Sequence, residues 1–207
     1  MEIKDTRNSN YTDLLLKKQM VWWKRFLNVQ APYRWNLQRL KPGFTLEIGC
    51  GIGRNLIHLK GQGVGVDHNL PSVEFARNQG LTAFTPEEFE VSDFNIPQYF
   101  NTLLLAHVAE HMTQNEVVKL INKYIPFVKP GGRLIMIAPQ EAGYKSDSTH
   151  VEFMDFPKLR NINKQLNLTV LQEYSFPFPR FIGHIFTYNE FISVSCKAEK
   201  SHSIQNK

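Results

Sequence analysis

The sequence has few cysteines and no long apolar run. Its 207 residues include two cysteines, Cys50 and Cys196, which imply no disulfide framework and fit a reducing compartment. No stretch approaches the ~18–20 apolar residues of a membrane-spanning helix, and no apolar signal region follows the charged residues 1–5. We therefore expect a soluble, cytoplasmic protein without a membrane span.

The sequence also lacks a block of charge of one sign, an internal repeat and a low-complexity tract. Lys and Arg number 24 against 19 Asp and Glu, and the net charge of +5 is spread along the chain. The segment most similar to a basic stripe is residues 17–39, and a helix face exposed to solvent explains its basic residues. Nucleic acid is therefore not the expected partner. With 42% hydrophobic residues, the chain can form a single core.

The N-terminal part is predicted to be helical. Apolar residues with helical spacing predict an amphipathic helix over about residues 12–29, namely Leu16, Met20, Trp23 and Leu27. Pro32 interrupts this pattern, and a second short helix is expected over residues 33–40. We expect residues 1–43 to be a helical cap on one main domain, residues 44–197. Residues 198–207 are expected to form a flexible tail.

The main domain shows strand and helix patterns in alternation. Helices are expected after Arg54 and Pro71, over residues 113–128 and over residues 157–166, and a polar, acidic loop is expected after the third strand. A turn at residues 129–132 should end the third of these helices. We predict an α/β fold: a Rossmann-like, seven-stranded, mostly parallel sheet with one antiparallel strand and helices on both faces. The predicted strands are residues 44–48, 64–67, 81–84, 101–106, 133–138, 168–176 and 184–196, the last two as an antiparallel pair.

A glycine-rich segment follows the first predicted strand. Gly49, Gly51 and Gly53 form a G-x-G-x-G pattern that lets backbone N–H groups approach a ligand closely, although an ordinary turn would use glycines too. The dinucleotide pattern needs a further glycine at position 54, where Arg54 stands, which disfavours NAD. Asp67 ends the second strand 18 residues after Gly49, where a carboxylate can accept both hydroxyls of an adenosine ribose.

Four segments carry a resemblance to the class I S-adenosylmethionine-dependent methyltransferases, which covers most of residues 44–196. They are residues 46–53 (LEIGCGIG), 65–67 (GVD), 105–112 (LAHVAEHM) and 129–134 (KPGGRL). The resemblance implies S-adenosylmethionine as cofactor, with Glu47 and the glycines at its methionine half, Asp67 at its ribose, and the loop from Thr85 beside adenine. Asn101 stands where the family often has Asp. The predicted cofactor-binding residues are Glu47, Gly49, Cys50, Gly51, Gly53, Asp67, His68, Glu87, Glu88 and His107.

Histidines and a carboxylate follow the fourth strand, beside the expected cofactor crevice. His107, Glu110 and His111 have i, i+3, i+4 spacing and would project to one side of a helical turn, and His150 follows the fifth strand. Three interpretations stay open. Glu110 and His111 could tie the turn by hydrogen bonds; Glu110, His111 and His150 could form the catalytic group, with a histidine as general base; or all four could bind a divalent metal. The pattern is similar to the Glu-x-x-Glu-His segment of small-RNA 2′-O-methyltransferases, with His107 replacing the first Glu, and to a related segment in ubiquinone-pathway O-methyltransferases.

The predicted function is methyl transfer from S-adenosylmethionine to an oxygen or nitrogen atom of a small-molecule acceptor. Because the displacement needs donor and acceptor held in line, acceptor residues are expected on loops beyond the strand ends. The alternatives are an RNA methyltransferase with a His/Glu metal site and a non-catalytic cofactor-binding module. Candidate acceptor residues are Arg34, Gln140, Glu141, Tyr144 and Arg180, each with packing or surface pairing as its simpler explanation.

Overall fold

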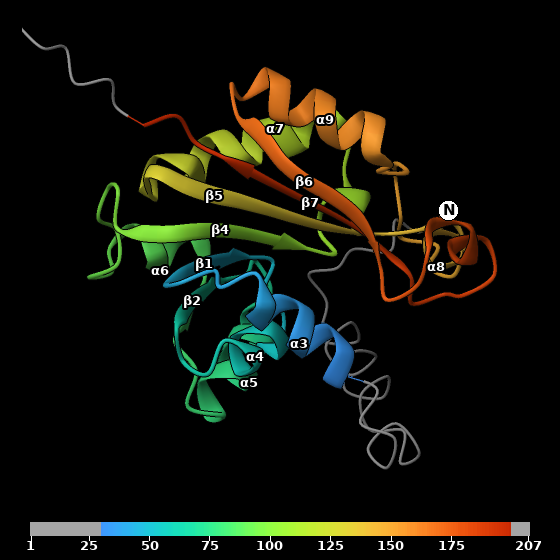
Figure 1. The fold of residues 1–207 in the computed structure, drawn as a ribbon. Coiled ribbons are helices and arrows are strands. Elements are labelled where there is room, and N and C mark those ends of the chain that lie inside the picture. The colour runs from blue at the N-terminus through green and yellow to red at the C-terminus, as the bar shows by residue number, and fades with distance from the viewer. Residues whose placement is uncertain (1–29, 200–207) are drawn as a thin grey trace, which may run out of the picture.

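The computed structural model describes residues 30–199, and in this part of the chain it contains a seven-stranded sheet. Figure 1 shows its arrangement. The strand order is β3-β2-β1-β4-β5-β7-β6, and β7 runs antiparallel to both of its neighbours while the other pairs are parallel. The predicted sheet and its antiparallel last pair are therefore confirmed. The strands are β1 (Thr45–Ile48), β2 (Gly63–Val66), β3 (Ala83–Phe84), β4 (Phe100–Ala106), β5 (Val128–Pro139), β6 (Thr169–Phe176) and β7 (Glu190–Cys196).

Helices cover both faces of the sheet (Figure 1). The helix predicted over residues 12–29 and residues 200–207 of the predicted tail lie outside the described residues. None of the helices within residues 30–199 has the length and apolarity needed to cross a bilayer. The helices are α3 (Ala31–Arg39), α4 (Arg54–His58), α5 (Leu70–Asn78), α6 (Pro86–Glu90), α7 (Gln114–Tyr124), α8 (Glu141–Lys145) and α9 (Phe156–Gln165), with 3-10 turns η1 (Ala109–His111), η2 (Ile125–Phe127) and η3 (Arg180–His184).

Each central strand supplies side chains to two separate hydrophobic layers. In β4, Leu103 and Leu105 pack with α7 and α9, whereas Leu104 and Ala106 pack with α3, α4 and α5 on the opposite face. Successive side chains of a strand point to opposite faces, so a strand buried on both sides reads as an uninterrupted apolar run. The apolar run in the sequence of β4 is therefore explained by its place in the middle of the sheet.

Two helix starts differ from the sequence prediction. Helix α3 begins at Ala31, before the predicted start at residue 33, and Pro32 lies in its first turn, where its missing N–H leaves no hydrogen bond unmade. The predicted polar loop after β3 contains α6, because Thr85 and Glu88 form a capping box: the Glu88 carboxylate accepts from Thr85 N at 2.8 Å and Thr85 Oγ1 accepts from Glu88 N at 3.3 Å.

Two strand starts also differ from the prediction. Helix α7 starts at the predicted capping box of Thr113 and Glu116, but it ends at Tyr124, and β5 already begins at Val128. Residues 129–132, predicted to be a turn, are extra residues within β5, because the pairing shifts between Val128 and Arg133. The last strand begins at Glu190, not at residue 184, because the chain first forms η3.

Candidate functional site

The carboxyl ends of the parallel strands meet at one edge of the sheet. The connections run from β1 outward to β2 and β3 in one direction, and through β4 to β5 in the other, so the order reverses between β1 and β4. In open α/β sheets this reversal opens a crevice outside the strand ends, where ligands bind. The glycine segment, Asp67 and His107 each follow one of these strand ends directly.

The glycine segment lies against the turn that follows β4. Gly49, Gly51 and Gly53 all have positive φ, of 72°, 52° and 83°, which residues with a Cβ rarely adopt. A Cβ on Gly49 would lie 2.3 Å from Cγ2 of Val108, and one on Gly53 would lie 2.3 Å from Cδ1 of Leu81. The backbone conformation therefore favours glycine at all three positions, and close approach also requires it at Gly49 and Gly53.

Asp67 is held by two backbone N–H groups. Its Oδ2 accepts from Gly51 N at 2.7 Å and its Oδ1 accepts from Asn69 N at 2.8 Å. Each carboxylate oxygen has about two acceptor positions, so one position on each oxygen is left for a ligand. The side chain is mostly buried at the sheet edge, and His68 beside it is half-exposed, with Nδ1 3.8 Å from Asp67 Oδ1. Asp67 can thus accept two adjacent hydroxyls while it also shapes the glycine segment.

Glu47 in β1 is a buried carboxyl group with one oxygen in need of a partner. Its Oε1 accepts from Asn55 Nδ2 at 2.6 Å, whereas Oε2 has no hydrogen-bond partner among the described residues. Burial raises the pKa of Glu47 to about 8, and the bond from Asn55 opposes this rise. The ammonium group of an amino-acid moiety would satisfy this oxygen and favour its charge.

The predicted cofactor residues Cys50 and Glu88 have partners within the fold. The Cys50 side chain is buried against Gly65, where an added Cβ would lie 2.5 Å from the Cys50 sulfur, and burial raises the pKa of its thiol. The Glu88 carboxylate accepts from Thr85 N and from Arg77 Nη2, the latter at 2.5 Å, and the Arg77 bond lowers its pKa. A cofactor role for the Cys50 backbone, for Glu88 and for the exposed Glu87 stays a prediction.

His107 is part of an ion-paired group after β4. It has a φ of 58°, and its Nε2 lies 2.8 Å from Oε1 of Glu190 while its Nδ1 lies 3.5 Å from Oε1 of Glu110. Burial lowers the pKa of His107, but the two carboxylates outweigh it and the pKa is raised to about 9. His107 is therefore charged at neutral pH, with each ring N–H facing a carboxylate.

A second group forms from Glu110, His111 and His150. The predicted helical turn exists as η1 and carries Glu110 and His111, while His150 comes from the loop after α8. One possible ligand atom from each residue lies within 4.8 Å of the other two, and the two imidazole rings are 4.9 Å apart. These three residues of the predicted cluster thus lie together as possible ligands, and the fourth, His107, contacts them through Glu110 Oε1 and not as a member of the group.

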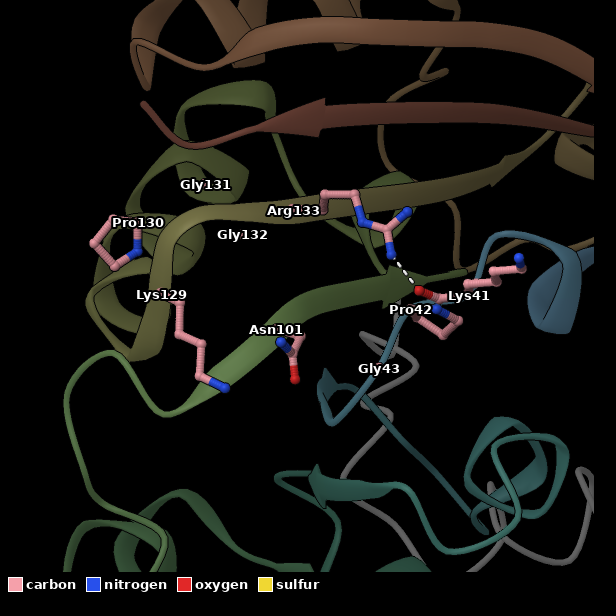
Figure 2. A pocket seen from close by; sticks show the side chains of 9 residues that line it. All are labelled: Lys41, Pro42, Gly43, Asn101, Lys129, Pro130, Gly131, Gly132 and Arg133. Atoms are coloured by element: carbon pink, nitrogen blue, oxygen red, sulfur yellow. Dashed lines mark hydrogen bonds between the residues drawn. The ribbon is translucent and has the colours of Figure 1, made fainter. Parts of the chain in front are cut away.

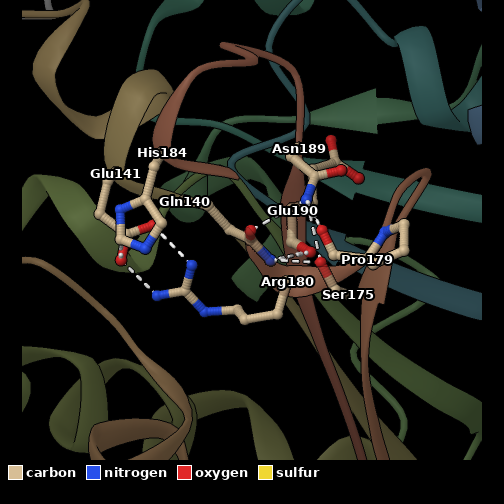
Figure 3. A network of polar contacts seen from close by, with 8 residues as sticks. All are labelled: Gln140, Glu141, Ser175, Pro179, Arg180, His184, Asn189 and Glu190. Carbon is tan, nitrogen blue, oxygen red and sulfur yellow. Dashed lines mark hydrogen bonds and ion pairs between the residues drawn. The ribbon is translucent and has the colours of Figure 1, made fainter. Parts of the chain in front are cut away.

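The loop between β6 and β7 is fastened to the end of β5 by buried amides (Figure 3). Gln140 Nε2 donates to Ser175 Oγ at 2.7 Å and to Glu190 O at 2.9 Å, and Asn189 Nδ2 donates to Gln140 Oε1 at 2.9 Å. Gln140 and Asn189 are fully buried. This network fixes the start of β7 and thereby the position of Glu190, a residue that the sequence prediction missed.

Arg180, a candidate for binding an acceptor anion, pairs with the first residue of α8 (Figure 3). Both of its terminal nitrogens donate to the Glu141 carboxylate, Nη1 at 2.7 Å, and its guanidinium lies 4.7 Å from the ring centre of Phe191. The neighbouring His184 lies 3.8 Å from the same carboxylate. The structure therefore favours the simpler explanation of Arg180, pairing with a nearby carboxylate, over the binding of an acceptor anion.

A pocket of about 220 Å³ lies at the other edge of the sheet, where β4 starts and β5 has its extra residues (Figure 2). Here Asn101 Oδ1 accepts from Phe44 N at 3.1 Å, and Arg133 Nη1 donates to Leu40 O at 2.7 Å. Asn101, which stands where the similar family often has Asp, thus supports the backbone before β1. The pocket is far from the carboxyl edge and does not belong to the candidate site.

Comparison with known proteins identifies a methyltransferase domain in this part of the chain. A family model described as a methyltransferase domain matches residues 45–132, which run from β1 into β5 and include the glycine segment, Asp67 and η1. A comparison with proteins of curated function found no match.

Several solved structures share the fold at low sequence identity. A magnesium protoporphyrin IX methyltransferase from Synechocystis PCC 6803 with bound S-adenosylhomocysteine is 13% identical, with a TM-score of 0.65, and the match covers 95% of this chain and 98% of that one. An S-adenosylmethionine-dependent methyltransferase from Archaeoglobus fulgidus is 17% identical, with a TM-score of 0.59 over 84% and 99% of the two chains. A Haloferax volcanii complex of the Trm112 methyltransferase activator and a putative methyltransferase matches with 14% identity and a TM-score of 0.60, over 90% and 98%.

Proposed function

We propose that the chain is a class I S-adenosylmethionine-dependent methyltransferase, as the match of residues 45–132 to a methyltransferase domain supports, and that it moves the methyl group of this cofactor to an oxygen or nitrogen atom of a small-molecule acceptor. In this reaction the acceptor atom attacks the methyl carbon, the carbon–sulfur bond breaks with its electron pair left on sulfur, and the acceptor loses its proton. Much of the catalysis is positioning, because the attacking atom, carbon and sulfur must lie in line.

The observation that carries the proposal is the pair of carboxyl groups on either side of the glycine segment. Asp67 keeps one acceptor position on each oxygen, which suits the two hydroxyls of a ribose. Glu47 keeps one buried oxygen without a partner among residues 30–199, which suits the ammonium group at the other end of the cofactor. The two groups match the two polar ends of S-adenosylmethionine, with the positive-φ glycines between them.

The acceptor is proposed to lie beside Glu110, His111 and His150. Val108, which lies against Gly49 of the glycine segment, is two residues before Glu110, and this closeness supports a place for the group at the methionine end of the cofactor. Arg180 is already paired with Glu141, which leaves no free guanidinium for a nucleic-acid backbone at this loop. A small acceptor also accords with magnesium protoporphyrin IX, the compound named for one of the similar structures.

Calorimetric titration with S-adenosylmethionine, S-adenosylhomocysteine and NAD tests the cofactor assignment. We expect the first two to bind and NAD not to bind. Asp67→Ala removes two charge-assisted hydrogen bonds to the ribose, so affinity should fall by about 100-fold or more. Glu74→Ala, which replaces an exposed acid of α5, is the matched control and should leave affinity unchanged. Preference for NAD would contradict the proposal.

Transfer of a labelled methyl group tests the acceptor class. The protein is incubated with methyl-labelled S-adenosylmethionine and a cell extract, which is then separated into small molecules, RNA and protein. Label should accumulate in the small-molecule fraction, as an ether, ester or methylamine. Label in RNA would favour the alternative RNA methyltransferase. Cofactor binding without label in any fraction would favour a non-catalytic module.

A further inference from the structure

Glu110 is a buried carboxylate whose surroundings in the described residues do not satisfy it. The residue is 1% exposed, and neither of its carboxylate oxygens has a hydrogen-bond partner. A buried carboxylate without hydrogen bonds is costly, so such groups are normally paired or bind a metal. Its nearest positive group, His107, lies 3.5 Å from Oε1 and is more closely paired with Glu190. The carboxylate thus has room for a second positive partner.

The contacts of His111 and His150 favour the tautomer in which Nε2 is free to bind a metal. Nδ1 of His150 lies 2.6 Å from the carbonyl oxygen of Tyr144, and Nδ1 of His111 lies 3.3 Å from the carbonyl oxygen of Thr149. A carbonyl oxygen only accepts hydrogen bonds, and the Thr149 hydroxyl, 3.2 Å from His111 Nδ1, donates its proton to Asp147 Oδ1 at 2.7 Å. Nδ1 therefore carries the proton in each ring and Nε2 keeps its lone pair. A metal-binding histidine is commonly oriented in this way, by donation from its other ring nitrogen to a carbonyl group.

From this geometry we infer that Glu110, His111 and His150 bind one divalent transition-metal cation. Their possible ligand atoms lie within 4.8 Å of one another. Ligands that share one ion at about 2.1 Å are roughly 3–4 Å apart, so closure of the site needs side-chain movements of about 1 Å. Two imidazoles and one carboxylate suit Mn²⁺, Fe²⁺ or Zn²⁺ better than Mg²⁺ or Ca²⁺, which prefer oxygen ligands. His107 is not a ligand, since both of its nitrogens face carboxylates.

This inference rests on the proposed function, to which it adds the means of activating the acceptor. Three protein ligands leave at least one coordination position open, next to the cofactor end of the crevice. An acceptor hydroxyl bound at that position would have a lowered pKa, release its proton to water, and attack the methyl carbon as a metal-stabilised oxygen. The metal ion would then replace a histidine general base, and the acceptor atom would be oxygen.

Metal binding to the full-length protein is the first test, and it needs neither cofactor nor acceptor. The protein is stripped with a chelator and titrated with Co²⁺, followed by its visible absorption, and with Zn²⁺, followed by calorimetry. We expect one equivalent of either ion to bind, with absorption typical of mixed nitrogen and oxygen ligands. The thermal midpoint should rise with ion concentration, because the ion binds the folded state. Absence of stoichiometric binding would overturn the inference.

The deciding variants are His111→Gln and His150→Gln, because replacement of the buried Glu110 also disturbs the fold. Replacing a residue that only supports a metal ligand weakens binding about 10–100-fold, and replacing either histidine ligand should weaken it more. His184→Gln is the matched control, since His184 is an exposed histidine that faces Glu141 at the same edge of the sheet. Equal metal affinity in the control and in the His111 and His150 variants would also overturn the inference.

Activity and cofactor binding separate failure of this inference from failure of the proposed function. Chelation should abolish methyl transfer and leave the affinity for S-adenosylmethionine unchanged, and added Mn²⁺, Fe²⁺ or Zn²⁺ should restore transfer. Full transfer by the stripped protein would refute the metal and favour a histidine base, while the proposed function stands. Metal binding without methyl transfer to any small molecule would refute the proposed function and leave the metal site in place.

Discussion

Replacement of Glu47 by Gln should stabilise the cofactor-free protein while it weakens cofactor binding. Glu47 is 1% exposed, and its pKa is raised to about 8 from the ordinary value of 4.5. Between these two values the folded protein holds a proton on Glu47 that the unfolded chain has released. Unfolding therefore releases a proton, and the free energy of unfolding falls as the pH rises through this range.

The size of the effect follows from the width of that range. Each pH unit between 4.5 and 8 costs the wild-type fold about 1.36 kcal/mol relative to a variant that does not ionise. The Glu47→Gln variant should therefore gain about 2.7 kcal/mol on the wild type between pH 5 and pH 7. Loss of the charged partner for the cofactor ammonium should cost about 1.5–3 kcal/mol of binding, or roughly 10- to 150-fold in affinity.

Urea unfolding of both proteins at pH 5, 6 and 7 measures the stability difference, and calorimetry measures the affinity for S-adenosylmethionine. The difference between the two proteins isolates Glu47, because all other titrating groups are shared. A difference that does not change with pH would refute the reasoning, since Glu47 would then carry its charge in the folded protein. Unchanged cofactor affinity would refute its proposed place at the ammonium group.

Two further predictions concern the neighbours of the glycine segment. Gly49→Ala should destabilise the protein by about 2–4 kcal/mol, because the φ of Gly49 is 72° and an added Cβ would lie 2.3 Å from Val108 Cγ2. Adding Val108→Ala to this variant should recover about 1–3 kcal/mol, as measured by urea unfolding of both single variants and the double variant. If the two single effects simply add up in the double variant, the contact is contradicted. Charged His107 should stabilise the fold fully below pH 6.5, with the contribution lost as the pH rises through about 9. Glu190→Gln should lower the pKa of His107 in an NMR titration, and an unchanged pKa would exclude the pairing.

The sequence was sufficient for the features that depend on neighbouring residues. The apolar runs predicted the central strands, since a strand covered on both faces needs apolar side chains at every position. The glycines at 49, 51 and 53 predicted a tight turn because their spacing reflects local backbone conformation. Helix α6 was also within reach, because Thr85 and Glu88 have capping-box spacing, but the acidic composition of the segment favoured a loop.

Other features depend on contacts between distant parts of the chain. Glu190 pairs with His107, 83 residues earlier, and this pairing exists only because β7 lies next to β5 and its start is fixed by Gln140 and Asn189. No local pattern marks these three residues as partners. The cluster of Glu110 and His111 with His150 was predicted as a neighbourhood, but the carbonyl groups that orient the two imidazoles could not be read from residue types.

The strand order also constrains how the protein is made on the ribosome. Strand β7, the last strand of the described part of the chain, lies between β5 and β6, so within this part β6 has no neighbouring strand until β7 has been synthesised. At about 5–20 residues per second, the nascent chain exposes the edge of β5 and an unpaired β6 for a second or more. Such edges can pair with other chains. Chaperone protection during translation should therefore matter most after β6 emerges, and premature termination before residue 190 should yield aggregates instead of a shortened but folded enzyme.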